Sequence, residues 1–379
     1  MIKSNQYKSL LFALLSLAIA SCIEPYNPPA ISETVDLLVV DGFINISDNS
    51  AKVSLSKATP IANDDGHVPE PNATVRIEDD NGGIYSLIEE ADGTYTSVNM
   101  DLSLSKKYRL IIVRGNGKEY FTDFVELKQT PPIDSISWAP TLRRDGINIY
   151  ANTHGENNNG RYYQWRFVET WEYTSKYFPG YELHNGVPLP NTVNVYQCWT
   201  TRPSSEILIA STTQLNENAI RNFPLIFIPK GAQKISRRYS IIVEQRSLTK
   251  EAYDFWNELK KTTENLGGLF DPLPSKVIGN LRSKNDSEEP VLGYFSGGST
   301  TQQRIFIRAA DLPEDIWLYP FQACPVDSIP VAQLSNYPNM FLIGTYGSPV
   351  VLGYIYASET NCMDCRDLGG DLKKPDFWE

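Results

Sequence analysis

The sequence has few of the side chains on which most catalytic sites depend. It contains only 3 histidines, 4 methionines and 5 cysteines in 379 residues. His67, His154 and His184 lie far apart in Gly- and Asn-rich segments, where we expect exposed side chains rather than a shared site. The G-x-S-x-G, H-E-x-x-H, P-loop and G-x-G-x-x-G patterns are also missing. The sequence therefore predicts no catalytic residue, no metal site and no cofactor.

Positive charge is scarce as well. The chain has 34 Lys and Arg against 45 Asp and Glu, and its formal net charge is -11. A protein this acidic has no general electrostatic attraction for nucleic acid or anionic lipid, so we expect no nucleic-acid partner. Neighbouring carboxylates, such as those at 79–80 and 89–90, point to opposite sides of an extended chain. They favour turns and solvated faces over acid–base pairs.

Long hydrophobic runs are limited to one, at residues 10–20, and it follows Lys3 and Lys8. It is shorter than the ~20 apolar residues of a transmembrane helix and has the length of a signal-peptide core. It ends in Ile-Ala-Ser-Cys, which resembles the lipobox of bacterial lipoproteins, where the signal is removed and the cysteine is acylated. We predict a lipoprotein signal peptide at 1–21, lipidation of Cys22 with palmitate or related chains, and a proline-rich tether at 22–34. An ordinary secretory signal is the alternative.

The remaining cysteines are even in number, which suits an exported protein. Cys198, Cys324, Cys362 and Cys365 allow three pairings. The Cys-x-x-Cys spacing at 362–365 also occurs in redox and zinc sites, but no thioredoxin pattern and no second such pair is present. We predict structural disulfides, with metal binding or free thiols as alternatives. We favour Cys362 and Cys365 each pairing with a distant cysteine, because this would fix the C-terminal tail.

Short strands and turns fill the first part of the mature chain. Residues 51–56 and 73–78 alternate between apolar and polar side chains, and the second run ends at the turn signal Asp-Asp-Asn-Gly-Gly. About seven such strands without helical periodicity predict an immunoglobulin-like β-sandwich over 35–130.

A second β-rich region, 131–357, follows the Gln-Thr-Pro-Pro linker, and one helix is expected near 250–266. Thr249 can cap this helix, and Gly267 and Gly268 can end it. Its apolar residues share one face, which we expect to pack on a sheet: Ala252, Phe255, Trp256, Leu259 and Leu266. The predicted fold is mainly β, with two immunoglobulin- or fibronectin-like β-sandwich domains, the second larger and carrying the helix. A cysteine-bearing tail covers 358–379.

Aromatic residues concentrate in 162–199. Along the first strand they share one parity, which predicts a core face: Tyr163, Trp165, Phe167, Trp171 and Tyr173. The opposite parity is mostly polar. The next segment, 176–190, is expected to be a loop, and Tyr177, Phe178 and Tyr181 lie there among prolines and glycines. We predict these three as exposed anchors for a ligand or partner, because tyrosine and phenylalanine offer large contact area. Burial in the core is the alternative.

Several short motifs occur together along the chain. They include Glu-Pro-Tyr after the lipobox, Leu-Val-Val-Asp-Gly at 38–42, Gly-Leu-Phe-Asp-Pro at 268–272 and the ending Pro-Asp-Phe-Trp at 375–378. Together they resemble the Bacteroidota outer-membrane lipoprotein family catalogued as domain of unknown function 4249. The resemblance implies an outer-membrane lipoprotein, commonly encoded beside TonB-dependent receptors of the nutrient-uptake type, and no established catalytic residues.

These observations lead to one main expectation about function. We expect a non-enzymatic outer-membrane lipoprotein, on the cell surface or the periplasmic face. It would bind or assemble beside a TonB-dependent receptor that transports nutrients, and the membrane contact would be the lipid anchor. The alternative is a secreted or surface hydrolase that acts on a polymer such as a glycan, through carboxylates that the sequence does not pair.

Overall fold

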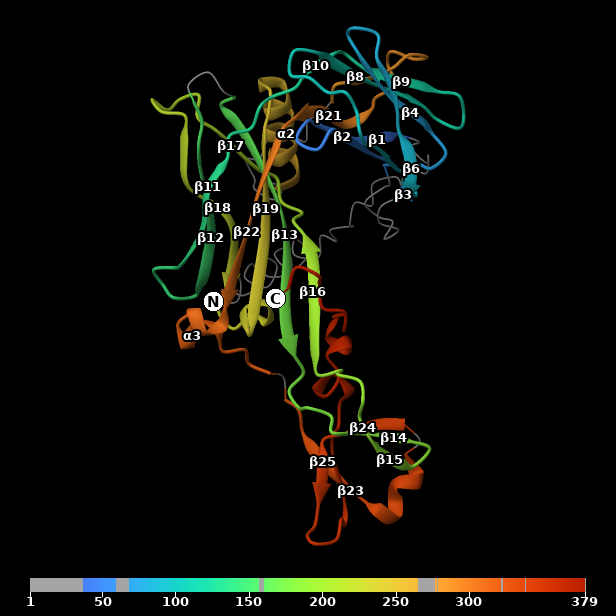
Figure 1. Cartoon of the computed structure of the whole chain (residues 1–379), viewed down its shortest axis with the longest axis vertical. Coiled ribbons are helices and arrows are strands. Elements are labelled where there is room, and N and C mark those ends of the chain that lie inside the picture. Colours follow the sequence, from blue (N-terminus) through green and yellow to red (C-terminus); the bar gives the residue numbers. More distant parts are fainter. Residues whose placement is uncertain are drawn as a thin grey trace, which may run out of the picture.

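The structure, a computed structural model, describes residues 37–58, 68–156, 160–264, 277, 279–321, 323–337 and 339–378. It is mainly β and built from sandwiches, as predicted. Figure 1 shows an N-terminal sandwich, a larger second sandwich and a small lobe that projects from the second. The predicted signal peptide, Cys22, the tether, His67 and the predicted helix end at 266–268 lie outside the described residues. No helix in the described ranges is long and apolar enough to cross a membrane.

The N-terminal sandwich consists of two sheets around one apolar core. One sheet has the order β21-β1-β2-β7-β6 with β3 on β2, and the other has the order β20-β9-β8-β4-β5 with β10 on β8. The core comes from alternate residues of both sheets, such as Val40, Val53, Ile77 and Leu110. The strands before the linker are β1 (Leu38–Asn45), β2 (Ser50–Lys57), β3 (Val68–Pro69), β4 (Thr74–Asp79), β5 (Ile84–Ser86), β6 (Ile88–Ala91), β7 (Thr94–Ser97), β8 (Lys107–Val113), β9 (Glu119–Thr122) and β10 (Val125–Glu126).

Two strands from much later in the chain complete this sandwich. β20 (Leu281–Ser283) pairs with β9, and β21 (Leu292–Gly298) runs parallel to β1. The sequence order places both in the second β-rich region, but hydrogen bonding places them in the first sandwich. Phe295 of β21 is fully buried in its core, and a Cβ at Gly42 of β1 would lie 2.8 Å from the Phe295 ring. Gly42 therefore leaves the room that Phe295 fills.

The second sandwich packs a three-stranded sheet, β11-β12-β18, against a larger sheet, β16-β13-β19-β22, with β17 on β13. Every aromatic residue predicted to form the core face of 162–174 is at least 94% buried between these sheets. The elements are β11 (Ile133–Pro140), β12 (Gly146–His154), β13 (Tyr162–Thr174), β16 (Gln197–Pro203), β17 (Leu208–Ser211), β18 (Ala219–Pro229), η1 (Gln233–Ile235), β19 (Arg238–Ser247), β22 (Thr300–Arg308), η2 (Ala309–Asp311) and α3 (Glu314–Trp317).

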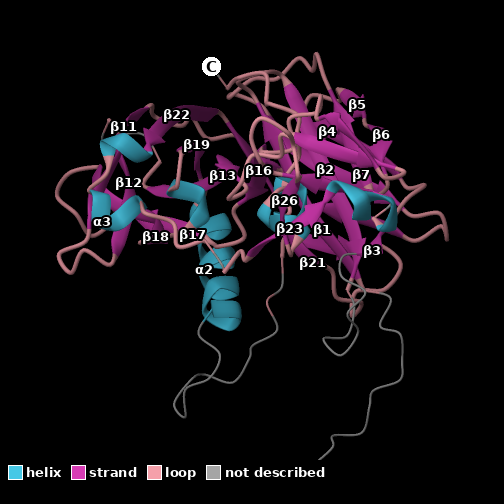
Figure 2. Ribbon diagram, turned by 90° about the horizontal axis from the view of Figure 1, so that it is seen from below, coloured by secondary structure: helices cyan, strands magenta, loops and turns pink. Residues whose placement is uncertain are grey.

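The helix α2 (Lys250–Glu264) lies where the two sandwiches meet (Figure 2). Its first turn is capped as predicted, because the Ala252 amide donates to Thr249 Oγ1 at 3.2 Å. Ala252 and Phe255 form a small core with Ile209 of β17 and Tyr294 of β21. The helix thus packs on a sheet as predicted, and it also joins the second sandwich to the first.

The projecting part, here called the distal lobe, comprises residues 177–197 and 324–358. Its two sheets have the orders β15-β14-β24 and β23-β26-β25, and Leu183, Ile329, Leu334 and Leu342 are buried between them. The segment predicted as an aromatic loop is therefore partly a hairpin. The elements are β14 (Tyr181–His184), β15 (Val187–Pro190), β23 (Val326–Pro330), η3 (Val331–Asn336), β24 (Asn339–Leu342), β25 (Gly344–Tyr346) and β26 (Gly353–Ala357).

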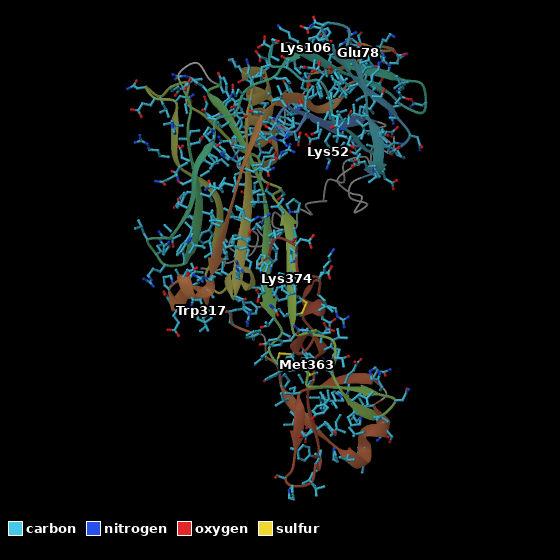
Figure 3. All side chains as sticks on the ribbon, viewed as in Figure 1. Lys52, Glu78, Lys106, Trp317, Met363 and Lys374 are labelled. Carbon is cyan, nitrogen blue, oxygen red and sulfur yellow. A yellow bond between two sulfur atoms is a disulfide. The ribbon has the colours of Figure 1, made fainter. Side chains whose placement is uncertain are left out.

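Two disulfides hold the neck between the distal lobe and the second sandwich (Figure 3). They join Cys198 to Cys365 and Cys324 to Cys362, so the prediction of disulfides with distant partners for Cys362 and Cys365 is confirmed. Cys362 is the last residue of the turn η4 (Thr360–Cys362), and Cys365 is the first residue of the turn η5 (Cys365–Leu368). Backbone hydrogen bonds add to this junction: Tyr177 N–H donates to the Cys362 carbonyl at 2.9 Å.

Candidate functional site

An open groove lies on the outer face of the larger sheet of the second sandwich, next to the N-terminal sandwich. Its volume is about 480 Å³, within the range of small-molecule sites. The floor comes from β13, β19 and β22, and the walls come from α2, β1 and the segment 203–207. It is therefore a site that six separate segments of the sequence form only after the sandwiches have assembled.

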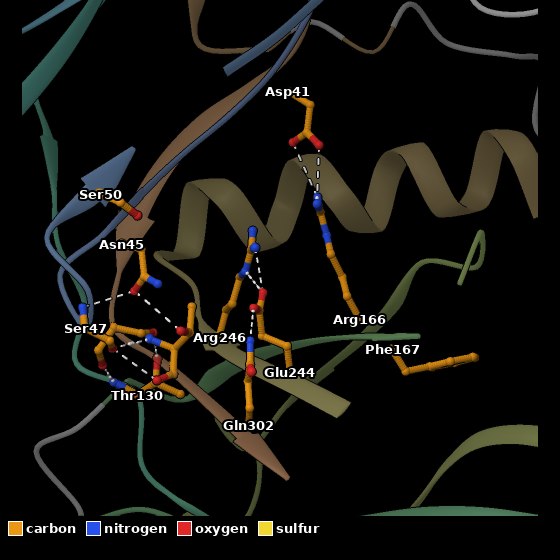
Figure 4. A network of polar contacts seen from close by, with 12 residues as sticks. Asp41, Asn45, Ser47, Ser50, Thr130, Arg166, Phe167, Glu244, Arg246 and Gln302 are labelled. Atoms are coloured by element: carbon orange, nitrogen blue, oxygen red, sulfur yellow. Dashed lines mark hydrogen bonds and ion pairs between the residues drawn. The ribbon is translucent and has the colours of Figure 1, made fainter. Parts of the chain in front are cut away.

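The floor is a ladder of polar side chains across three strands. Arg166 of β13 lies opposite Glu244 of β19, which lies opposite Gln302 of β22. All three point outward because side chains alternate along a strand, and the inward positions hold the aromatic core. The Glu244 carboxylate accepts from Arg246 Nε at 2.6 Å and from Gln302 Nε2 at 2.8 Å (Figure 4). Both of its oxygens are thus engaged within the protein.

Arg166 links the floor to two of the three walls. Its Nη1 and Nη2 each donate to an Asp41 carboxylate oxygen at 3.3 Å, and Asp41 belongs to β1 (Figure 4). The guanidinium also lies over the Trp256 ring of α2, with its carbon 5.7 Å from the ring centre. The Arg166 and Asp41 side chains are 37% and 50% exposed, so their ion pair adds little stability. Its main effect is to orient these side chains at the rim.

Arg246 lies deeper, at the boundary with the N-terminal sandwich. Its guanidinium carbon is 3.8 Å from the centre of the Phe43 ring of β1. Burial lowers the pKa of Arg246, and the neighbouring Glu244 carboxylate acts against this shift. The Arg246 guanidinium nevertheless keeps its charge at neutral pH, because arginine is effectively always protonated in proteins. The Glu244–Arg246 pair is thus a fixed, neutral unit beneath the groove.

The C-terminal tail covers the other end of the same sheet face. Trp378 Nε1 donates to Glu172 Oε2 at 3.2 Å, and the Arg304 guanidinium lies 3.6 Å from the centre of the Phe377 ring. Arg238 lies over the Trp378 ring at 5.4 Å. The Pro-Asp-Phe-Trp ending therefore packs on the outer, polar face of the sheet near Glu172. The groove is left open only at the end of this face that carries Arg166.

Among the residues that the structure describes, seven carboxyl groups have a pKa that their surroundings shift, and in each of them the pKa is lowered. In each case hydrogen bonds and nearby cations outweigh any effect of burial. A carboxylic acid that protonates a leaving group needs the opposite shift. These residues are Glu70, Glu78, Asp79, Glu126, Glu289, Asp311 and Asp315.

The three predicted anchors lie in or next to the neck of the distal lobe, away from the groove, and only one is exposed. Phe178 is 56% exposed and contacts the edge of Tyr196. Tyr177 is half-buried, and its hydroxyl donates to the Cys324 carbonyl at 3.3 Å. Tyr181 is half-buried in β14 and packs against Tyr354. The structure thus separates an exposed Phe178 from two tyrosines that stabilise the lobe and its neck.

The histidines that the structure describes are not brought together. His154 Nδ1 lies 2.7 Å from Asp134 on the second sandwich, and His184 lies 3.2 Å from Glu182 in the distal lobe. Over the described ranges, no cluster of His, Cys, Asp and Glu is arranged to hold a metal ion.

Sequence reasoning missed the groove residues, although one signal for them was present. Arg166 is one of the polar residues that alternate with the aromatic residues in 162–174, and this alternation marks the outer face of a sheet. Its partners Glu244 and Gln302 come from strands far along the chain, and Asp41 comes from the other sandwich. Local patterns do not specify such pairings, because they depend on sheet order and register.

The family model for the domain of unknown function DUF4249 matches residues 23–304 of this chain. The chain belongs to this family. The part matched by the DUF4249 model contains every residue that lines the groove, from Asp41 to Gln302. The disulfide partners Cys324, Cys362 and Cys365 lie beyond the matched part.

Comparison with other proteins adds little to the DUF4249 assignment. None of the curated proteins matches the chain. Among solved structures, a DUF4785 family protein from Legionella pneumophila is 9% identical, with a TM-score of 0.18. That similarity covers 52% of this chain and about half, 48%, of the Legionella chain. A TM-score this low supports no argument about function.

Proposed function

We propose that this DUF4249 protein is a non-enzymatic lipoprotein of the outer membrane, on its cell-surface or periplasmic face. It serves there as a binding or assembly subunit of a TonB-dependent nutrient transporter. The anchor is proposed from the lipobox that ends at Cys22, and several acyl chains on one residue give stable anchoring. The transporter is proposed from the resemblance to Bacteroidota lipoproteins.

The observation that carries the binding role is the groove with its paired charges. Asp41 pairs with Arg166 and Glu244 pairs with Arg246, so these four charged groups at its floor and rim are compensated without a ligand. An uncharged polar ligand can hydrogen-bond to the exposed Gln302 and to Arg166 and leave these pairs intact. Trp256 adds an apolar surface beside them. Such preorganisation reduces the entropy cost of binding.

The alternative function, hydrolysis of a polymer such as a glycan, receives less support from this geometry. Hydrolysis by two carboxylates requires one that stays protonated near neutral pH. Three carboxylates line the groove, and two of them, Asp41 and Glu244, already have both oxygens hydrogen-bonded within the protein. Neither of these two is therefore free to act on a substrate. The arrangement therefore favours recognition over acid catalysis.

The lipid anchor is tested by Cys22→Ser in the full-length chain. We expect labelled palmitate to be incorporated into the wild-type protein and not into this variant, which would accumulate as an uncleaved or soluble precursor. Incorporation of labelled fatty acid by Cys22→Ser would disprove the lipobox assignment.

The subunit role is tested by purifying the tagged protein from detergent-solubilised outer membranes. We expect a TonB-dependent transporter to be recovered with it in a stable complex. Hydrolysis of a glycan panel by the purified protein, with no transporter recovered, would support the alternative function instead.

The groove is tested with neutral oligosaccharides and uncharged peptides as probes, with binding followed by calorimetry. If a probe binds there, Arg166→Ala should weaken it by at least about tenfold, because a central polar contact is lost. Arg221→Ala is the matched control, since Arg221 is exposed and pairs with Glu217 away from the groove. Equal affinity of the Arg166→Ala and control variants would show that the probe binds elsewhere.

A further inference from the structure

The distal lobe differs in composition from the rest of the chain. Across residues 177–197 and 324–358 the only Asp, Glu, Lys or Arg residues are Glu182 and Asp327, whereas such residues make up 21% of the whole sequence. Tyrosine is frequent instead, at 177, 181, 196, 337, 346, 354 and 356. Depletion of charge and enrichment of tyrosine are the compositional marks of a protein interface core.

The lobe also exposes much apolar surface for its size. It contributes about half of the large hydrophobic side chains that are exposed in the described residues, although it is about a seventh of the chain. A single exposed apolar residue is ordinary, but a cluster on one small lobe marks an interaction surface. The exposed side chains are Phe178, Val187, Leu189, Val193, Val326, Val331, Tyr337, Val350, Val351 and Leu352.

Four of these side chains form an aliphatic knob, with three on the loop between β25 and β26 and one on η3. Val350, Val351 and Leu352 are 67%, 41% and 60% exposed, and Val331 of η3 is 49% exposed. The Val331 amide donates to the Leu352 carbonyl at 3.0 Å, which holds the two segments together. The Leu352 amide donates to the Tyr346 carbonyl at 2.9 Å and closes the loop. Backbone hydrogen bonds therefore fix the segments that carry the knob side chains.

The neck holds the lobe in a defined position. Besides the two disulfides, the Tyr173 hydroxyl donates to the Cys365 carbonyl at 3.1 Å, and Ser175 Oγ donates to the Met363 carbonyl at 3.1 Å. Figure 1 shows that the lobe projects beyond both sandwiches. A rigid, projecting surface loses little entropy on docking.

The composition identifies a protein rather than a lipid surface as the occupant. Peripheral membrane-binding surfaces carry lysine or arginine for the lipid headgroups, and the lobe has neither residue. Tyrosine is common to membrane interfaces and protein interfaces, so the distinction rests on the missing basic residues. Strand addition by the partner is also disfavoured at two of the lobe's four edge strands. The edge strand β15 contains Pro188 and Pro190, and the edge strand β23 ends at Pro330, which cannot donate backbone hydrogen bonds.

We infer that the distal lobe is the docking surface for the transporter, through an uncharged apolar face on that partner, and that the knob is its central contact. The inference rests on the proposed function, because it names the surface through which the subunit assembles. The groove is then left free for a ligand while the lobe is docked, since the two lie on different parts of the molecule.

The test compares two valines of equal exposure in the full-length protein. Val350 is 67% exposed on the knob, and Val98 is 68% exposed on the N-terminal sandwich. We expect Val350→Asp to lower the recovery of transporter from outer membranes about 30-fold, which corresponds to a hot spot of about 2 kcal/mol. Val98→Asp should stay within about twofold of wild type. Because both side chains are exposed, neither variant should lower the melting temperature, and Leu352→Asp provides a second knob variant.

The outcomes separate this inference from the proposed function. If wild type and both knob variants recover the transporter equally, the docking surface is disproved and the subunit role stands. If wild type recovers no transporter, both fail. Concentration-dependent dimerisation, or binding to neutral phosphatidylcholine vesicles, that Val350→Asp abolishes would also overturn the inference, because another occupant would then cover the knob.

Discussion

The N-terminal sandwich and the distal lobe are stabilised in opposite ways. The N-terminal sandwich has a large continuous core and a set of ion pairs, and none of the disulfides lies in it. The distal lobe has a core of four fully buried side chains, almost no charge, and two disulfides at its neck. A unit this small buries too little apolar surface to offset the conformational entropy that its chain loses on folding. The two disulfides supply additional stabilisation. Surface charge is then dispensable for its stability.

Ion pairing in the N-terminal sandwich extends into its interior. Arg114 Nε and Nη2 donate to the two Glu70 carboxylate oxygens at 2.8 and 3.0 Å, and the Arg114 side chain is 1% exposed. Burial raises the pKa of Glu70, but Arg114 and Lys57 outweigh this and hold it below its usual range. The charged pair therefore persists at neutral pH inside the sandwich.

The largest expected effect is the loss of both disulfides. Replacing all four cysteines by serine should cost the lobe and neck about 2–5 kcal/mol for each bridge, because the unfolded chain regains its freedom. Hydrogen exchange should then show lost protection in 177–197 and 324–358, with protection in β1, β2 and β8 unchanged. A uniform loss across the molecule would contradict the independence of the two regions.

The buried ion pair should give the next largest effect. Arg114→Ala should lower the free energy of unfolding of the N-terminal sandwich by about 3 kcal/mol, because Glu70 would remain buried with only Lys57 beside it. Arg109→Ala is the matched control. Arg109 is 38% exposed beside Glu78, so its loss should cost less than about 1 kcal/mol. Urea unfolding of both variants measures the difference, and equal effects would disprove the interior role of Arg114.

Acid should distinguish the two regions more gradually. The folded-state pKa values of Glu70, Glu78, Asp79, Glu126 and Glu289 are lowered, so folding favours their charged forms. The resulting stability is present above the unfolded-state values of about 4 and is lost as the pH falls through the lowered values. The N-terminal sandwich should therefore lose hydrogen-exchange protection below about pH 4. The lobe has only two carboxylates, so its protection should change less. Loss of protection in the lobe at a higher pH than in the N-terminal sandwich would contradict this prediction.

The smallest effect concerns the predicted anchors at the neck and in the lobe. Phe178→Ala should change the free energy of unfolding by less than about 0.5 kcal/mol, because the ring is largely exposed. Tyr181→Ala should cost about 1–3 kcal/mol, because its ring packs against Tyr354. Thermal unfolding followed by near-ultraviolet circular dichroism measures both. Equal losses would place Phe178 in the core.

The aromatic segment shows where sequence reasoning succeeds and where it stops. On β13, period-two alternation predicted a core face, and the five aromatic side chains of that face are buried as expected. Beyond Thr174 the same reasoning treated 176–190 as one exposed loop. The structure instead pairs β14 with β15 and with β24, which comes from much later in the chain. Tyr181 is thereby packed in the lobe, while Phe178 stays exposed.

The sequence alone determined the local features of this protein: alternating strands, the capped start of α2, the buried aromatic face and an even set of cysteines that form disulfides. Each depends on neighbouring residues or on composition, so it can be read from short segments. Tertiary structure decided the rest: which cysteines pair, the return of β21 to β1, the groove from Asp41 to Gln302, and the separate distal lobe. These features depend on contacts between residues that are distant in the sequence. Their geometry forms only when the strands have paired in their final order and register.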